Sequence, residues 1–111
     1  MATGDKNTSL GIDENVEGLL AYLFGWISGI ALLLLEKDNN FVRFHAMQSI
    51  AVFAGLTVLD IIFTFIPGLW FLTWILGIVA FVLWIYLMIK AYQGERYKLP
   101  YVGEWAEKQV G

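Results

Sequence analysis

The chain has 111 residues, of which 59% are hydrophobic and 15% are charged, whereas soluble domains carry about 25% charged residues. A small protein has a large surface to cover with polar groups, so this composition excludes a soluble globular enzyme, and the apolar content excludes a disordered chain. The length allows one domain, the lack of cysteine excludes disulfides, and the net charge of −3 gives no attraction to nucleic acid.

Three apolar stretches follow a polar, acidic N-terminal tail, residues 1–14. A membrane-spanning helix needs about 20 mostly apolar residues, and such runs lie at about 16–35, 44–66 and 69–89. We therefore predict an all-α membrane protein in which residues 15–92 form one domain of three transmembrane helices.

The second and third predicted helices form a tight antiparallel hairpin, because only Pro67-Gly68 separates them. Gly94 can end the third helix, and Leu99-Pro100 prevents its continuation. The remaining residues, 93–111, are predicted to form an amphipathic segment at the membrane interface.

The orientation follows from the basic residues. Three spans place the 36–43 loop and the C-terminal tail on one side of the membrane. That side carries six basic residues, and the other carries Lys6 and the uncharged Pro67-Gly68 turn. Because cytoplasmic loops are rich in Lys and Arg, we expect the C-terminus in the cytoplasm and the N-terminus outside. The six are Lys37, Arg43, Lys90, Arg96, Lys98 and Lys108.

Small residues provide packing faces on the first two helices. Gly18, Gly25 and Gly29 share one face of the first helix, and the Gly25-x-x-x-Gly29 spacing permits close approach of a second helix. The partner is either another helix of the same chain or the same helix in a homodimer. Ala51 and Gly55 give the second helix a similar smooth face.

The second helix also carries a polar stripe. At 100° per residue its members lie within about 120° of one another, and the stripe includes Asp60 inside the apolar segment. An ionisable residue there faces the bundle interior or a wet cavity. Two interpretations remain open: a path for protons or polar solutes, or a structural clamp through a hydroxyl such as that of Thr73. The stripe comprises His45, Ser49, Thr57, Asp60 and Thr64.

Signatures of catalysis are missing from the chain. It contains no G-x-S-x-G, H-E-x-x-H, Walker A or G-x-G-x-x-G motif. One histidine cannot form a histidine-rich metal site within a protomer. We predict a protein that is not an enzyme and that holds neither cofactor nor metal.

Two segments carry a family resemblance, EKDNNFVRFHAMQS at 36–49 and KAYQGERYKLPYVG at 90–103. They resemble the small prokaryotic membrane proteins of unknown function that are grouped with the "twenty" subunit of the chloroplast Tic translocon. The resemblance implies a multi-pass protein of the prokaryotic plasma membrane and suggests a connection with protein translocation. It implies no catalytic activity.

Both segments fall on the cytoplasmic side of the predicted topology, where they would form a basic-aromatic patch. This patch is either an interfacial anchor that contacts anionic lipid headgroups or a docking site for a partner. Its members are Arg43, Phe44, His45, Lys90, Tyr92, Arg96, Tyr97 and Lys98.

The leading functional prediction is an accessory or scaffold subunit that associates through its helices, either with copies of itself or with another membrane protein. The alternative is a small oligomeric channel or transporter that uses Asp60 and the polar stripe.

Overall fold

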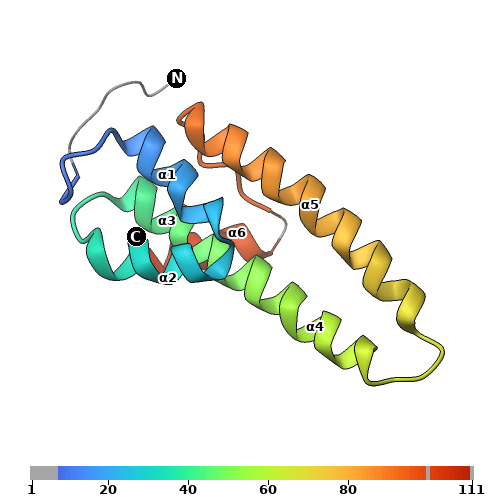
Figure 1. Ribbon diagram of the computed structural model, residues 1–111. Coiled ribbons are helices and arrows are strands. Elements are labelled where there is room, and N and C mark those ends of the chain that lie inside the picture. The colour runs from blue at the N-terminus through green and yellow to red at the C-terminus, as the bar shows by residue number, and fades with distance from the viewer. Residues whose placement is uncertain (1–7, 100, 111) are drawn as a thin grey trace.

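The computed structural model describes residues 8–99 and 101–110, so the first seven residues of the predicted polar tail lie outside it. The described residues are helical, without strands, and form an elongated molecule with extents of 49 × 22 × 22 Å. Figure 1 shows a body of several short helices from which two long helices project.

The predicted first span is wrong as a single helix. It consists of two ten-residue helices, α1 (Glu14–Leu23) and α2 (Trp26–Leu35). Gly25 separates them with φ +63°, a left-handed conformation that glycine adopts without steric cost. Ten helical residues extend about 15 Å, half the hydrocarbon thickness. Neither helix can therefore cross a bilayer alone.

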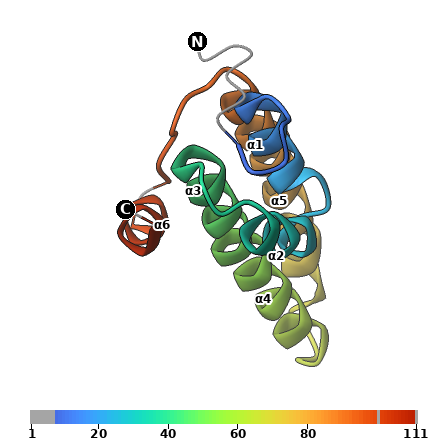
Figure 2. The same ribbon diagram turned by 90° about the vertical axis from the view of Figure 1, so that its left-hand side faces the viewer.

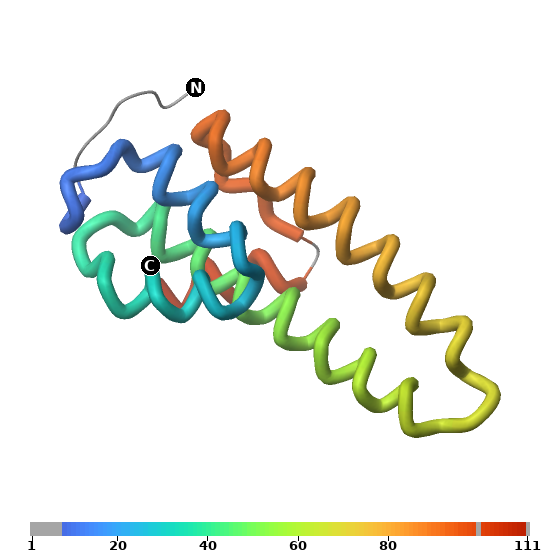
Figure 3. The backbone as a smooth tube through the Cα atoms, in the orientation of Figure 1, coloured from blue at the N-terminus to red at the C-terminus, as the bar shows by residue number. Residues whose placement is uncertain are grey.

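The chain doubles back at Gly25, as the tube in Figure 3 shows. The backbone N–H of Ser9 donates to both carboxylate oxygens of Glu36, each at 2.8 Å. The chain therefore enters and leaves this helical pair at the same end of the molecule. The sequence predicted that the residues before the first span and those after it lie on opposite sides of the membrane. The contact between Ser9 and Glu36 contradicts that prediction.

The second predicted span is a continuous helix of three parts: α3 (Asn40–Ser49), the π-helical segment η1 (Ile50–Ala54) and α4 (Gly55–Thr64). Asn39 caps its start, because the Asn39 side chain accepts a hydrogen bond from Val42 N at 3.1 Å. The 25 residues from Asn40 to Thr64 are long and apolar enough to cross a membrane.

The third predicted span is α5 (Trp70–Tyr92), with 23 residues and a higher mean hydropathy than the α3–α4 helix. It runs antiparallel to α4 after the turn at Pro67-Gly68, as expected (Figure 1). Gly94, with φ +80°, ends the helix, and Glu95 N donates to Lys90 O at 3.0 Å in a Schellman arrangement.

The C-terminal segment contains α6 (Val102–Val110). Figure 2 shows α6 beside α3, on the side away from α1 and α5. Gly103 lets the start of α6 lie against the segment that precedes it, because a Cβ at that position would collide with the Lys98 backbone. Trp105 remains half exposed on α6.

Buried residues are confined to the helical body. α4 contains none, and α5 contributes only Leu87 and Ala91 near its C-terminal end. The side chains of Tyr22, Phe44 and Leu87 are fully buried in the body. The part of the hairpin distant from the body exposes its apolar surface, which is the expected condition of helices that face lipid.

Candidate functional site

A buried polar network lies at the centre of the helical body, around His45. Its Nδ1 lies 2.7 Å from the Tyr22 hydroxyl, and its Nε2 lies 2.8 Å from the carbonyl oxygen of Glu95. A carbonyl only accepts hydrogen bonds, so Nε2 carries the ring hydrogen and Nδ1 accepts from Tyr22. Both nitrogens are satisfied, and His45 is a neutral structural residue rather than a free member of a polar path.

Gln48 extends this network one turn along α3. Its Nε2 donates to the Tyr22 hydroxyl and to Tyr97 O, both at 2.9 Å, and its Oε1 accepts from Leu99 N at 3.1 Å. Together His45 and Gln48 bind the main chain of residues 95–99. The segment after α5 is thus fixed to α3 by hydrogen bonds rather than by apolar contacts alone.

The doubled-back pair α1–α2 is fixed to α3 in a similar manner. The Ser49 hydroxyl donates to Gly25 O at 2.8 Å. A Cβ on Gly29 would lie 2.9 Å from Ala46 O, and one on Gly18 would lie 3.0 Å from the Phe41 ring. These two predicted packing glycines therefore lie against helices of their own chain, which occupies the surface that a homodimer would need.

Two buried carboxyl groups, Glu17 and Glu36, lie where the chain enters and leaves the α1–α2 pair. Glu36 accepts hydrogen bonds from the backbone N–H groups of Ser9, Asp38 and Asn39 at 2.8–3.1 Å. The Glu17 oxygens accept none from the described residues. A protonated Glu17 can instead donate to Glu36, which makes the two groups an acid and a carboxylate.

The pKa values of Glu17 and Glu36 are shifted in opposite directions. Burial, the hydrogen bond to Glu36 and the negative charge of Glu36 raise the pKa of Glu17 to about 7. Burial works against ionisation of Glu36 too, but hydrogen bonds from Ser9, Glu17 and Asp38 outweigh it and lower the pKa of Glu36 to about 2. Between these pH values the pair holds one proton.

The predicted polar stripe divides into two environments at η1. A π-helical turn places about one extra residue in the helix, so positions beyond it no longer keep the α-helical register. His45 and Ser49 point into the body, whereas the Thr57 and Thr64 hydroxyls donate to carbonyls of their own helix, Phe53 O and Asp60 O. The five residues do not form one continuous path.

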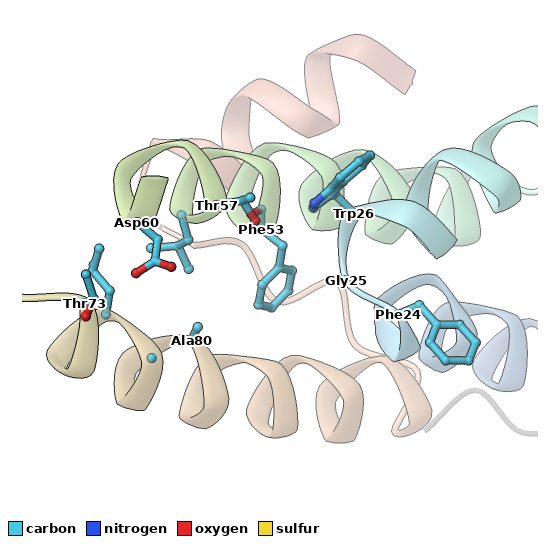
Figure 4. Close-up of a pocket in the computed structure, with 11 residues that line it drawn as sticks. Phe24, Gly25, Trp26, Phe53, Thr57, Asp60, Thr73 and Ala80 are labelled. Carbon is cyan, nitrogen blue, oxygen red and sulfur yellow. The ribbon is translucent and has the colours of Figure 1, made fainter. Parts of the chain in front are cut away.

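Asp60 lies at the gap between α4 and α5 and is half-buried. It lines a cavity of about 350 Å³ that reaches the Gly25 turn, together with Thr57, Thr73 and Gly77 (Figure 4). Its carboxylate makes no hydrogen bond with any described residue, the Thr73 hydroxyl included, and that hydroxyl donates to Trp70 O. The proposed clamp from Asp60 to Thr73 is therefore not formed.

The predicted basic-aromatic patch is partly internal. Phe44 and His45 are fully buried, and the Tyr92 and Tyr97 carbonyls accept hydrogen bonds from Asn15 and Gln48. Arg43 donates from Nη1 to Leu33 O and Glu36 O at the end of α2.

The remaining cations of the patch lie near acidic side chains. Lys90 pairs with Glu95 at 3.2 Å, and Lys98 and Arg96 pair with Glu107 at 3.0 and 3.7 Å. Arg96 also lies 5.6 Å from the centre of the Phe44 ring. The Lys98 hydrogen bond lowers the pKa of Glu107. These pairs reduce the positive charge that the patch presents to headgroups.

The two predicted packing residues of the second helix, Ala51 in η1 and Gly55 in α4, differ from Gly18 and Gly29. A Cβ on Gly55 would meet nothing within 4 Å, and the residue is exposed. Ala51 is half-buried and lines a shallow apolar hollow with residues of the C-terminal segment, Tyr101, Val102 and Trp105. The predicted packing face is therefore covered by the C-terminal segment at Ala51 in η1 and uncovered at Gly55 in α4. Within residues 8–99 and 101–110 no three acidic or histidine side chains gather closely enough to hold a metal ion.

Known proteins resemble the chain over most of its length. Residues 10–106 match the model of the magnetosome magnetite crystal formation protein family. The chain belongs to this family. It is 56% identical to a UPF0132 membrane protein of Methanocaldococcus jannaschii over 91% of this chain and 92% of the relative. It is 54% identical to another from Archaeoglobus fulgidus, over 88% and 96%. No solved structure matches.

These relatives support the expected small prokaryotic membrane family and place family members in archaea. They give no link to the chloroplast Tic translocon, so that part of the resemblance finds no support. Membrane localisation agrees with the relatives' names and with the two helices able to span a bilayer.

Several residues that build the polar body were missed in the sequence, chiefly Tyr22, Gln48, Glu17 and Glu36. Gln48 and Glu36 do lie within the 36–49 segment that carries the family resemblance, and that was the available signal. Tyr22 and Glu17 sit in a segment that reads as a plain apolar span. Tyr22 meets His45 and Gln48 at separations of 23 and 26 residues, and Gln48 meets Leu99 at a separation of 51. A local sequence pattern does not encode such contacts.

Proposed function

We propose that the family member described above is a non-enzymatic scaffold or accessory subunit that acts by association of membrane helices. The observation that carries this proposal is the open face of α4 at Gly55. Membrane helices associate through small residues that let backbones approach closely. Gly18 and Gly29 already serve contacts within the chain, whereas nothing in the described chain covers Gly55. A second copy, or a helix of another membrane protein, fits there.

The family description supports an assembly role. It names a formation process, that of magnetite crystals in magnetosomes, and no chemical reaction. For this chain we propose only the general part, which is helping to organise a membrane structure. Contact with the lipid bilayer, including anionic headgroups near exposed Lys37 and Lys108, belongs to the same proposal.

We further propose a topology of two spans, α3–α4 and α5, with α1–α2 entering the membrane and returning. The hydrogen bonds from Ser9 to Glu36 and from Asn15 to Tyr92 O support it, because they join three chain segments at one end of the molecule. That end carries the basic residues, and the Pro67-Gly68 turn has none. The positive-inside rule then assigns residues 8–13 and the C-terminal segment to the cytoplasm.

Single cysteines test this topology, since the chain has none of its own. Leu10→Cys and Lys108→Cys should be protected from a membrane-impermeant maleimide in intact cells, and Ile66→Cys should be labelled. Labelling of Leu10→Cys without Lys108→Cys would restore the three-span arrangement and overturn this one.

The association is tested by Gly55→Leu, with Gly77→Leu on α5 as the matched control. Both glycines have open space around them, so neither change should disturb the fold. We expect crosslinked oligomers or partner complexes in native membranes to be lost with Gly55→Leu and kept with Gly77→Leu. A wild-type protein recovered as a monomer without partners would contradict the scaffold role.

A small oligomeric channel or transporter is the second candidate, and the cavity beside Asp60 favours it. In proteoliposomes, Asp60→Asn should abolish the proton flux of the wild type, with Thr64→Val as a control at the end of the same helix. Equal flux in the wild type and Asp60→Asn, or none in either, would exclude this candidate.

A further inference from the structure

The cavity beside Asp60 has one polar end made only of acceptors. The Thr57 hydroxyl donates its hydrogen to Phe53 O at 2.7 Å, and the Thr73 hydroxyl donates to Trp70 O at 2.6 Å. Both oxygens therefore present lone pairs to the cavity. The Asp60 carboxylate adds a negative charge and more lone pairs. No described residue donates to it, so this end lacks donors and positive charge.

The other end of the cavity is apolar and aromatic. It is bounded by Phe53 and Leu56 from the α3–α4 helix and by Trp26 at the start of α2. In Figure 4 the Phe53 ring projects into the space between the two long helices. The Trp26 indole lies on the far side of this ring from Asp60. A bare or hydrated inorganic cation would gain nothing from these walls, whereas an organic cation would bury its apolar part there.

A second cavity of about 450 Å³ meets the first at Asp60, Thr73 and Gly77, and is bounded by Trp74 and Phe81 on the outer surface of α5. Gly77 has no side chain to close the gap between the two, and a Cβ there would meet no atom within 4 Å. The carboxylate is thus reachable from the side of the hairpin. Asp60 is also only four residues from the end of α4, about 6 Å along the helix.

We propose that this cavity is a binding site for a primary organic ammonium with a small apolar or aromatic body. The –NH3⁺ group supplies three donors and a positive charge to Asp60, Thr57 and Thr73. The apolar body lies against Phe53 and Trp26. A volume of about 350 Å³ is at the lower end of small-molecule sites, which span about 300–1,000 Å³. The inference is independent of helix association and of flux, because a binding site needs neither.

Equilibrium dialysis of the purified protein in detergent tests the proposal, with 2-phenylethylammonium as the probe and 2-phenylethanol as its neutral counterpart of similar size. For a ligand this small we expect a dissociation constant of about 1 mM. The alcohol should bind at least about tenfold more weakly, because it lacks the charge and two of the donors.

Three variants locate the site. Asp60→Asn should weaken ammonium binding at least about tenfold and leave alcohol binding unchanged. Gly77→Leu should abolish binding of both probes by filling the cavity, and Gly55→Leu, outside the cavity, should affect neither. Equal binding of the two probes, an unchanged affinity in Asp60→Asn, or no ammonium binding at tenfold the expected constant would each overturn the proposal. Circular dichroism confirms that each variant is folded.

Discussion

The helical body and the projecting hairpin satisfy their polar groups in opposite ways. In the body, Tyr22, His45 and Gln48 are fully buried, and each has hydrogen-bond partners on distant parts of the chain. In the hairpin, the Thr57 and Thr64 hydroxyls bond only to their own helix, and the Asp60 carboxylate bonds to no described residue. Both regions are built from the same long helix, which crosses from one to the other at η1.

The contrast shows which region is self-sufficient. The body can hold its arrangement through contacts that it makes itself, so its sequence is constrained by internal geometry. The hairpin exposes large apolar side chains, and α4 contains no buried residue. Its stability should therefore respond weakly to side-chain truncation and strongly to what surrounds it, and the following changes test that difference.

Gln48→Met should have the largest effect. It keeps the side-chain size but leaves Leu99 N and Tyr97 O partly buried without their partner, at a cost of about 1–3 kcal/mol each. We expect about 4 kcal/mol less unfolding free energy in detergent titrations and faster proteolysis within residues 94–101. Thr57→Val on the hairpin should cost no more than about 0.5 kcal/mol. Similar losses in the two variants would contradict the contrast.

Truncation of two apolar residues on α5 compares the regions directly. Leu87→Ala should cost about 3 kcal/mol, because Leu87 is fully buried and leaves a cavity. Ile78→Ala, at a position 65% exposed, should cost less than about 0.5 kcal/mol. The same titrations measure both. A large loss for Ile78→Ala would mean that the hairpin is packed internally after all.

Glu17→Gln should remove a pH dependence of the body. The folded pKa of Glu17, about 7, lies above its ordinary value of 4.5, so the folded state binds more protons between these values. Wild-type stability should therefore fall as the pH rises from about 4.5 to 7, by about 2 kcal/mol. Unfolding measured at pH 5 and pH 8 should show this loss of stability in the wild type and in the exposed control Glu104→Gln. It should be absent in Glu17→Gln.

Gly25→Ala should lower stability by about 1 kcal/mol, less than Gln48→Met, Leu87→Ala or the pH effect of Glu17, because alanine is strained at a φ of +63°. A Cβ there makes only ordinary contact with Phe53, at 3.6 Å. Gly77→Ala in the α5 helix should instead stabilise slightly, because alanine favours helices. Thermal unfolding followed by circular dichroism measures both signs. A stabilised Gly25→Ala would mean that α1 and α2 can join as one helix.

The sequence predicted the hairpin well, because its two signals are local. Apolar length identifies α5, and Pro67-Gly68 marks the turn. The prediction of a single first helix was wrong for a related reason. A glycine at position 25 is compatible both with a continuous membrane helix and with a turn between two helices. What decides between them is the Ser9 contact with Glu36, which joins residues 27 apart in the chain.

The polar stripe shows the same limit. A helical wheel places His45 on the same face as Asp60 only if every turn between them is α-helical. No residue type in Ile50–Ala54 predicts the π-helical turn that the structure has there. Only the structure could therefore separate a structural histidine from an aspartate whose carboxylate has no partner among the described residues. The prediction that Asp60 faces a cavity followed from the cost of burying its charge, and it did not depend on the register.

The hydrogen bonds from α3 to the segment after α5 also set an order of events during synthesis. His45 and Gln48 meet Glu95 and Leu99, which follow 50 and 51 residues later in the chain. At a rate of protein synthesis of about 5–20 residues per second, the partners of these two side chains are made about 3–10 s later. Until then they need water or a chaperoning surface. The N-terminal end of this helix therefore reaches its final environment only after the hairpin has been made.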